Sequence, residues 1–175
     1  THNENIQTIT KIIDLANSIN SKTEDVIYTI AIMLLERKNM INKMHVKKVI
    51  SEYTYQFIDV FDSLEIPDNE KDLLGVVYQS LRTEGSKNIS GSYYTPSHIT
   101  DVLCNTFIIN KNQKALDPCC GSGAFLLSIS CDSPDCLYGF DIDPIAVMMA
   151  KINLLLKYSD YEFIPHVYVL DYLKS

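Results

Sequence analysis

The chain has 175 residues, of which 46% are hydrophobic and 21% charged, so it can hold one domain of ordinary size and is too apolar for wholesale disorder. No apolar run approaches the roughly 20 residues that span a bilayer, and no signal-peptide pattern opens the chain. Its formal net charge of −7 argues against this chain, alone, gripping a phosphate backbone, which requires clustered Lys and Arg. The five cysteines lack metal-site spacing and predict reduced thiols in a cytoplasmic protein.

The first half of the chain predicts a helical subdomain over residues 1–84. Apolar side chains recur at three- and four-residue steps, which predicts four amphipathic helices over residues 3–20, 21–38, 43–64 and 70–82. Ser21 and Glu24 have the spacing of a capping box at the start of the second helix. No strand pattern interrupts this half, so we interpret its apolar stripes as core.

A polar, glycine-bearing segment follows and predicts a linker over residues 85–96. At its end, Thr95 is a favourable helix cap and Pro96 a favourable first helical residue. The third segment, residues 97–175, then changes rhythm to strand, loop and helix. Strands are predicted up to Asp117, Asp141 and Asp171, with helices over residues 123–129 and 144–157 between them. This alternation predicts an α/β fold with a parallel sheet.

A glycine turn joins the first of these strands to its helix, in the stretch Leu116–Leu126. Gly121 and Gly123 allow the backbone to approach a ligand, and the following helix start offers unpaired N–H groups. Asp117 would repel a pyrophosphate. It suits a ligand that carries positive charge, such as the amino acid end of S-adenosylmethionine.

Each predicted strand ends in a carboxylate, and the carboxyl ends of parallel strands line one crevice. Asp141 lies 18 residues beyond Gly123, close to the offset of an acid that accepts hydrogen bonds from ribose hydroxyls. Asp171 is then placed to accept from the amine of a base. An Asp at a strand end often only caps the next turn, but three beside a glycine turn favour a binding site.

Two other sites share parts of this pattern. Asp141 and Asp143 could form an Asp-x-Asp metal site, but Pro144 favours Asp143 as a helix cap, so we expect no metal. A nicotinamide dinucleotide domain is the other serious interpretation of the crevice. It requires a longer glycine run, and Phe125 stands near the position of the third glycine.

Three stretches in order, Gly91–Pro96, Asp117–Leu126 and Gly139–Pro144, closely resemble the DNA adenine-N6 methyltransferases of bacterial restriction-modification systems. Both the type I modification subunits and the fused type II enzymes of that family are similar. The resemblance covers about residues 70–175 and includes the helix around Leu73–Tyr78. It implies a Rossmann-like, S-adenosylmethionine-dependent methyltransferase fold, here truncated after about three parallel strands and preceded by the helical subdomain.

The resemblance also implies roles for individual residues. Tyr94 and Thr95 would hold the methionine carboxylate of S-adenosylmethionine, and Ile142 would cover its adenine ring. Asp141 would accept from the ribose, and Asp171 with Tyr172 would meet the adenine edge. Cys119 and Cys120 stand where the motif tolerates small residues, which implies packing rather than a catalytic thiol. The full set of implied cofactor-binding residues is Tyr93, Tyr94, Thr95, Pro96, Asp117, Pro118, Cys119, Gly121, Gly123, Asp141, Ile142, Asp171 and Tyr172.

One departure from the family pattern limits the expected activity. The family's catalytic tetrapeptide, Asn or Asp followed by Pro-Pro and an aromatic residue, does not occur in the 175 residues. We therefore expect an N-terminal fragment that binds cofactor at most and has no catalytic residues of its own. The first residue, Thr1, is also consistent with a processed or trimmed chain.

The resemblance implies double-stranded DNA as a partner, through parts of the parent protein outside this chain, and specificity and endonuclease subunits as further partners. A sheet that ends at its third strand leaves an unpaired edge, which predicts self-association through that edge or disorder over residues 158–175. Two alternatives remain open. One is a non-catalytic helical assembly module with a vestigial Rossmann-like half, and the other is a methyltransferase that acts on RNA or protein.

Overall fold

The computed structural model describes residues 2–67, 71–85, 95, 97–104, 108–109 and 113–174. In the first half, three of the four predicted helices are confirmed, with ends within about three residues of the prediction. These are α1 (His2–Ser18), α2 (Thr23–Arg37) and α4 (Leu73–Gly85). Their apolar stripes are buried as predicted, with Ile12, Ile30 and Leu74 fully enclosed.

The predicted helix over residues 43–64 is wrong. Its place is taken by a two-turn helix, α3 (Met44–Ile50), a turn at residues 51–52 that leads into an extended segment up to residue 58, and a short 3₁₀ helix, η1 (Asp59–Ser63). Side chains of α2 explain the difference, because they accept from the extended backbone: Gln56 N–H donates to Asp25 at 2.8 Å and Ile58 N–H to Thr29 at 3.0 Å. These bonds replace the helical ones. Val60, an apolar residue within the predicted helix, is 47% exposed.

The predicted capping box at residues 21–24 is also wrong. The residue before α2 is Lys22, and no side chain caps that helix start. The Ser21 hydroxyl instead donates to the Ala16 carbonyl at 3.2 Å, so it serves the end of α1.

The predicted parallel sheet is confirmed. Strands β2 (Ala115–Asp117), β4 (Leu137–Asp141) and β5 (His166–Val169) lie in the order β2-β4-β5, and both neighbouring pairs are parallel. Helix α6 (Ala124–Ser128) joins the first pair, and α7 (Pro144–Lys157) joins the second. The bounds of α7 match the prediction because its sequence carries both signals of a helix start, the cap Asp143 and Pro144.

A second, two-stranded parallel sheet was not predicted. It pairs β1 (Ile108–Ile109) with β3 (Ser130–Cys131). Strands of two residues are too short to show alternation, so periodicity cannot predict them. Helix α5 (Ser97–Cys104) precedes this sheet and the 3₁₀ turn η2 (Pro134–Cys136) follows it.

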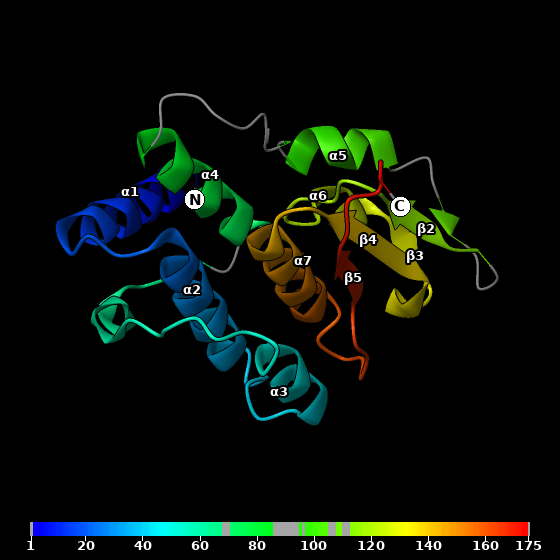
Figure 1. Ribbon diagram of the computed structural model, residues 1–175, viewed down its shortest axis with the longest axis horizontal. Coiled ribbons are helices and arrows are strands. Elements are labelled where there is room, and N and C mark those ends of the chain that lie inside the picture. The colour runs from blue at the N-terminus through cyan, green and yellow to red at the C-terminus, as the bar shows by residue number, and fades with distance from the viewer. Residues whose placement is uncertain are drawn as a thin grey trace.

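Helix α7 lies between the helical half and the sheet, where it contacts α2 and α4 on one side and β4 and β5 on the other (Figure 1). It is apolar on nearly all sides because it is enclosed on nearly all sides. Buried side chains therefore form one continuous cluster from α1 to β5. The division into segments 1–84, 85–96 and 97–175 stays a prediction.

Candidate functional site

The carboxyl ends of β2, β4 and β5 form one edge of the sheet (Figure 1). The glycine turn follows β2 at that edge. The register pairs Asp117 with Gly139 and Asp141 with Val169, so β4 extends two residues beyond the end of β2. Two hydrogen bonds extend the ladder beyond the strands, from Cys120 N–H to Phe140 at 2.8 Å and from Leu170 N–H to Asp141 at 2.9 Å. The parallel topology thus places Asp117, Asp141 and the residues that follow β5 at one edge of the sheet.

The glycine turn requires both of its glycines. Gly121 has φ +54° and Gly123 has φ +91°, which are left-handed conformations that residues with a Cβ rarely adopt. A Cβ on Gly121 would meet nothing within 4 Å, so open space lies over that residue. A Cβ on Gly123 would lie 3.3 Å from the Cβ of Ala150, so this glycine also lets the turn pack on α7.

Asp117 presents an unsatisfied acceptor at the start of this turn. One carboxylate oxygen accepts from Cys119 N–H at 3.2 Å, whereas Oδ2 is buried and has no hydrogen-bond partner within the described part of the chain. Burial raises the pKa of the Asp117 carboxyl, and the negative charge of Asp141 adds to this, against the opposing effect of Cys119 N–H. A cation at Oδ2 would relieve the cost of this buried oxygen.

Asp141 is held by the backbone on both oxygens. Oδ2 accepts from Gly121 N–H at 2.8 Å, and Oδ1 accepts from Asp143 N–H at 2.9 Å. The carboxylate therefore links the glycine turn to the loop after β4. Each carboxylate oxygen has two lone pairs, so the geometry leaves acceptor capacity for a ligand hydroxyl.

Asp143 is a structural residue, as the sequence predicted. Its Oδ1 accepts from Ile145 N–H at 2.9 Å and caps α7. Its Oδ2 accepts from the Tyr78 hydroxyl at 2.5 Å and lies 3.5 Å from the guanidinium of Arg82, both on α4. Among the described residues, no group of three or more His, Cys, Asp and Glu side chains could hold a metal ion.

The residues that the resemblance assigns to the adenine follow β4, the middle strand, and β5, the outer strand, at the same edge. Ile142 is 70% exposed, which leaves a large apolar side chain open to solvent at the site. Tyr172 stacks on Phe140 with ring centroids 6.1 Å apart. Asp171 lies two residues beyond the end of β5, where its carboxylate accepts from Leu173 N–H and pairs with Lys174 at 3.0 Å.

The remaining predicted site residues divide into three groups. Pro118 lies in the turn, half-buried, and Cys119 next to it is exposed, so the predicted packing role fits only the buried Cys120. Burial raises the pKa of the Cys120 thiol, which keeps it protonated. Thr95 is half-buried just ahead of α5. Tyr93, Tyr94 and Pro96 lie outside the described residues.

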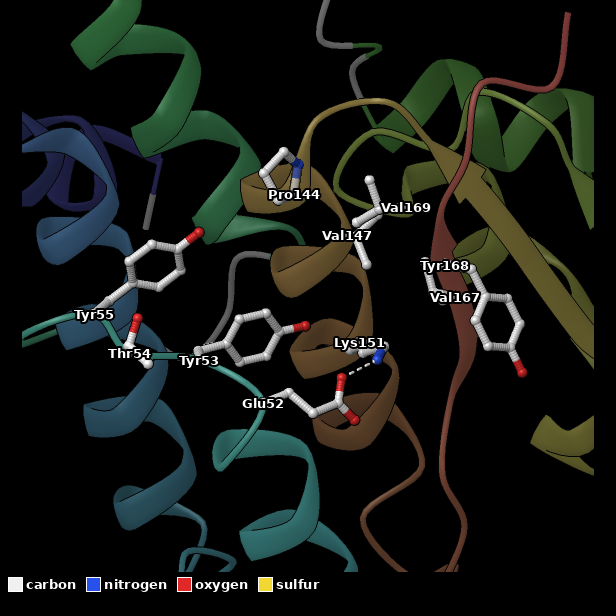
Figure 2. Close-up of a pocket in the computed structure, with 10 residues that line it drawn as sticks. All are labelled: Glu52, Tyr53, Thr54, Tyr55, Pro144, Val147, Lys151, Val167, Tyr168 and Val169. Atoms are coloured by element: carbon white, nitrogen blue, oxygen red, sulfur yellow. Dashed lines mark hydrogen bonds and ion pairs between the residues drawn. The ribbon is translucent and has the colours of Figure 1, made fainter. Parts of the chain in front are cut away.

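A cavity of about 410 Å³ lies between the extended segment, α7 and β5 (Figure 2), and no residue of the glycine turn lines it. Tyr53 projects toward α7, and its buried hydroxyl has no partner in the described part of the chain. Glu52 and Lys151 form an ion pair of 2.5 Å at the floor. This cavity could not be predicted from the sequence, because the apolar periodicity predicts a helix over residues 52–55. The lining residues are Glu52, Tyr53, Thr54, Tyr55, Pro144, Val147, Lys151, Val167, Tyr168 and Val169.

A parallel sheet with a glycine turn and carboxylates at its carboxyl edge defines a mixed helix-and-sheet protein, and in open parallel sheets ligands bind outside the carboxyl ends of the strands. The family follows from sequence comparison. The model of the N-6 DNA methylase family matches residues 69–174, which is more than half of the chain. The chain belongs to this family, and the resemblance predicted from its motifs is confirmed.

Three similar proteins illustrate the relationship. The methylase subunit of the type I restriction enzyme MjaVII of Methanocaldococcus jannaschii is 25% identical over 181 residues, which cover 99% of this chain and 27% of that protein. The type II restriction enzyme and methyltransferase RM.BcgI of Heyndrickxia coagulans is 30% identical over 115 residues, covering 57% and 18%. A crystallised modification subunit from Vibrio vulnificus YJ016 aligns with a TM-score of 0.49 at 19% identity, covering 73% of this chain and 31% of that one.

The chain thus spans about a fifth to a quarter of the length of the relatives it matches by sequence. Within its described residues, no helix combines the length and apolarity needed to cross a membrane.

Proposed function

We propose that this chain forms the S-adenosylmethionine-binding part of a DNA adenine-N6 methyltransferase of a restriction-modification system. Membership of the N-6 DNA methylase family supports the reaction class. The observation that carries cofactor binding is the buried Oδ2 of Asp117, an acceptor at the start of the glycine turn that has no partner among the described residues. The ammonium group of a methionine moiety is a cation of the right size to pair with it.

The other residues of the edge fit the rest of the cofactor. Asp141 is fixed by two backbone N–H groups and keeps lone pairs for the ribose hydroxyls. Ile142 offers an exposed apolar side chain for one face of the adenine, and Asp171 offers an acceptor for its amine. The open space over Gly121 leaves room for a ligand against the backbone. Thr95, with Tyr93, Tyr94 and Pro96 of its motif, completes the proposed set.

The bound cofactor would supply a methyl group activated on a sulfonium sulfur. Transfer to adenine also requires residues that polarise the target amine and stack on the flipped base. The 175 residues contain no Pro-Pro pair and so no tetrapeptide of the catalytic type. We therefore propose that these residues bind the cofactor and that methyl transfer depends on residues outside them. Double-stranded DNA and specificity or endonuclease subunits are the proposed partners of the whole protein.

Calorimetric titration with S-adenosylmethionine tests the binding proposal. We expect saturable binding at one site, retained by S-adenosylhomocysteine, which has the same amino acid and adenosine ends, and absent for the dinucleotide NAD. Asp117→Ala removes the proposed partner of the ammonium and should abolish measurable binding. Tight NAD binding, or unchanged binding of S-adenosylmethionine by Asp117→Ala, would contradict the proposal.

A second experiment tests the proposed division of labour. The chain is incubated with S-adenosylmethionine labelled on its methyl group and with DNA of mixed sequence, and label in the DNA is counted. We expect no transfer above a protein-free control. Transfer to DNA by these 175 residues would show that they hold catalytic groups that their sequence does not reveal.

A further inference from the structure

Three buried polar side chains adjoin the glycine turn and play no part in the proposed cofactor contacts. Asp72 at the start of α4 is 1% exposed, Asn153 on α7 is 4% exposed, and Ser122 in the turn itself is 8% exposed. Polar groups at this depth destabilise a fold unless they are hydrogen-bonded. Their partners therefore show what they hold in place.

Asp72 caps α4, because its Oδ1 accepts from Gly75 N–H at 2.9 Å. A cap of this kind needs only one acceptor and does not require burial. Asp72 has further partners: Oδ1 also accepts from the side-chain amide of Asn153 at 2.7 Å, and Oδ2 accepts from the Ser122 hydroxyl. The carboxylate thus joins two helices to the turn.

Ser122 is the anchor of the turn. It stands between Gly121 and Gly123, which have no side chains. Of these three residues, Ser122 alone has a side chain that can form a hydrogen bond. Asp72 holds that hydroxyl, and Asn153 also donates to the Ser122 carbonyl at 3.0 Å. Both the side chain and the backbone of the middle residue are therefore fixed.

Gly75 makes the close approach of α4 possible. A Cβ on this residue would lie 2.5 Å from Asp72 Oδ2 and 2.5 Å from Ser122 Oγ, well inside van der Waals contact. The first turn of α4 is thus fitted to the hydrogen bond between Asp72 and Ser122. A helix cap alone gives no reason for this fit.

We propose that Asp72 is a positioning residue for the cofactor turn. Through Ser122 it holds the left-handed backbone of Gly121 and Gly123, in which Gly121 N–H bonds to Asp141 and the space over Gly121 stays open. A turn held in this form before binding does not have to be ordered by the ligand, which lowers the cost of association. The consequence for cofactor affinity rests on the proposed function, whereas the consequence for the turn does not.

Hydrogen exchange with peptide resolution tests the proposal on the full 175-residue chain. Asp72→Ser keeps a good helix cap but its side chain is too short to reach Ser122, and Ser122→Ala removes only the hydroxyl. In both variants we expect exchange at the amides of residues 116–126 to accelerate about tenfold more than at the amides of α2 and β4, which accelerate only as far as the global stability falls. Thr29→Val is the matched control, because like Ser122→Ala it removes one buried hydroxyl. The Thr29 hydroxyl accepts from Ile58 N–H and lies far from the turn in sequence.

If Asp72 acts only as a cap, the turn in Asp72→Ser exchanges at the wild-type rate, and this result overturns the proposal. Equal acceleration throughout the chain in Ser122→Ala also overturns it, since the bond would then serve global stability only. Ser122→Ala decides the matter if Asp72→Ser does not fold.

The affinity for S-adenosylmethionine provides a second measurement. We expect the Kd to rise about tenfold in Asp72→Ser and Ser122→Ala, and to stay unchanged in Thr29→Val. An unchanged Kd in both turn variants contradicts the positioning role for binding. If the wild-type chain does not bind S-adenosylmethionine, the proposed function fails, and the exchange rates still decide whether Asp72 positions the turn.

Discussion

Two carboxylates adjoin the same glycine turn, and their surroundings differ in one respect. On the α4 and α7 side, Asp72 is buried with donors on both oxygens, from Gly75, Ser122 and Asn153. On the β2 side, Asp117 is half-buried, and its Oδ2 has no partner within the described residues. The fold satisfies the first carboxylate completely and leaves the second unsatisfied. The contrast teaches that carboxylates beside one turn differ in what the fold itself supplies to them, and it supports the proposed assignment of Asp117 to a ligand.

Removal of the satisfied carboxylate should have the largest effect on stability. Asp72→Ala leaves the buried donors of Ser122 and Asn153 without their acceptor and removes the cap of α4. We expect the free energy of unfolding to fall by about 3 kcal/mol, measured by urea denaturation. A loss below about 1 kcal/mol would mean that water or neighbouring groups replace these bonds. The claim that Asp72 stabilises the fold would then be wrong.

Asp117→Asn should separate stability from binding. A neutral amide is less costly to bury than a carboxylate, so we expect the free energy of unfolding to rise by about 1 kcal/mol. Cofactor affinity should fall by about 2 kcal/mol, or roughly thirtyfold, because the charge that pairs with the ammonium is lost. Denaturation and calorimetry on the same sample measure both. Changes of the same sign in the two measurements would contradict the assignment of Asp117 to a ligand.

Tyr78→Phe sharpens the comparison at another contact of α4, the hydrogen bond from Tyr78 to Asp143 in the loop after β4. The variant removes the hydroxyl that donates to Asp143 at 2.5 Å and keeps the ring. Because Arg82 still neighbours Asp143, we expect a loss of about 1 kcal/mol in the free energy of unfolding. Cofactor affinity should stay within twofold of wild type. A large loss of affinity would place this contact in the cofactor site.

The smallest expected effect is a pH dependence that belongs to Asp117. Its pKa is raised in the folded chain, chiefly by burial, so the folded chain binds the proton more tightly than the unfolded chain. The stability of wild type relative to Asp117→Asn should therefore decrease as pH rises from the ordinary Asp value of 3.8 through the raised value, and level off above it. Cofactor affinity should rise over the same interval, because ionised Asp117 binds the ammonium. Denaturation of both chains at a series of pH values checks the sign.

Much of the sheet edge could be predicted from sequence because its signals are local. The cap Asp143 followed by Pro144 determines where α7 begins, and the glycines of the turn determine where the backbone must adopt positive φ. Parallel topology then brings the strand ends together whatever packs around them. The extended segment over residues 53–58 could not be predicted in this way, because the acceptors for Gln56 and Ile58 are side chains of α2, about 30 residues earlier.

The sequence by itself determined the family, the parallel strands and the residues at their carboxyl ends, because motif order and periodicity depend on neighbours in the chain. The tertiary structure alone decided which carboxylate is satisfied and which is not. The sequence around Asp72 is that of an ordinary helix cap, and the sequence around Asp117 is that of an ordinary strand end. Only the approach of α4, α7 and the turn buries Asp72 among donors, and only the packing around β2 buries Asp117 Oδ2 without a donor from the described residues. Burial and hydrogen-bond partners are properties of the assembled fold, and they assign different functions to the same residue type.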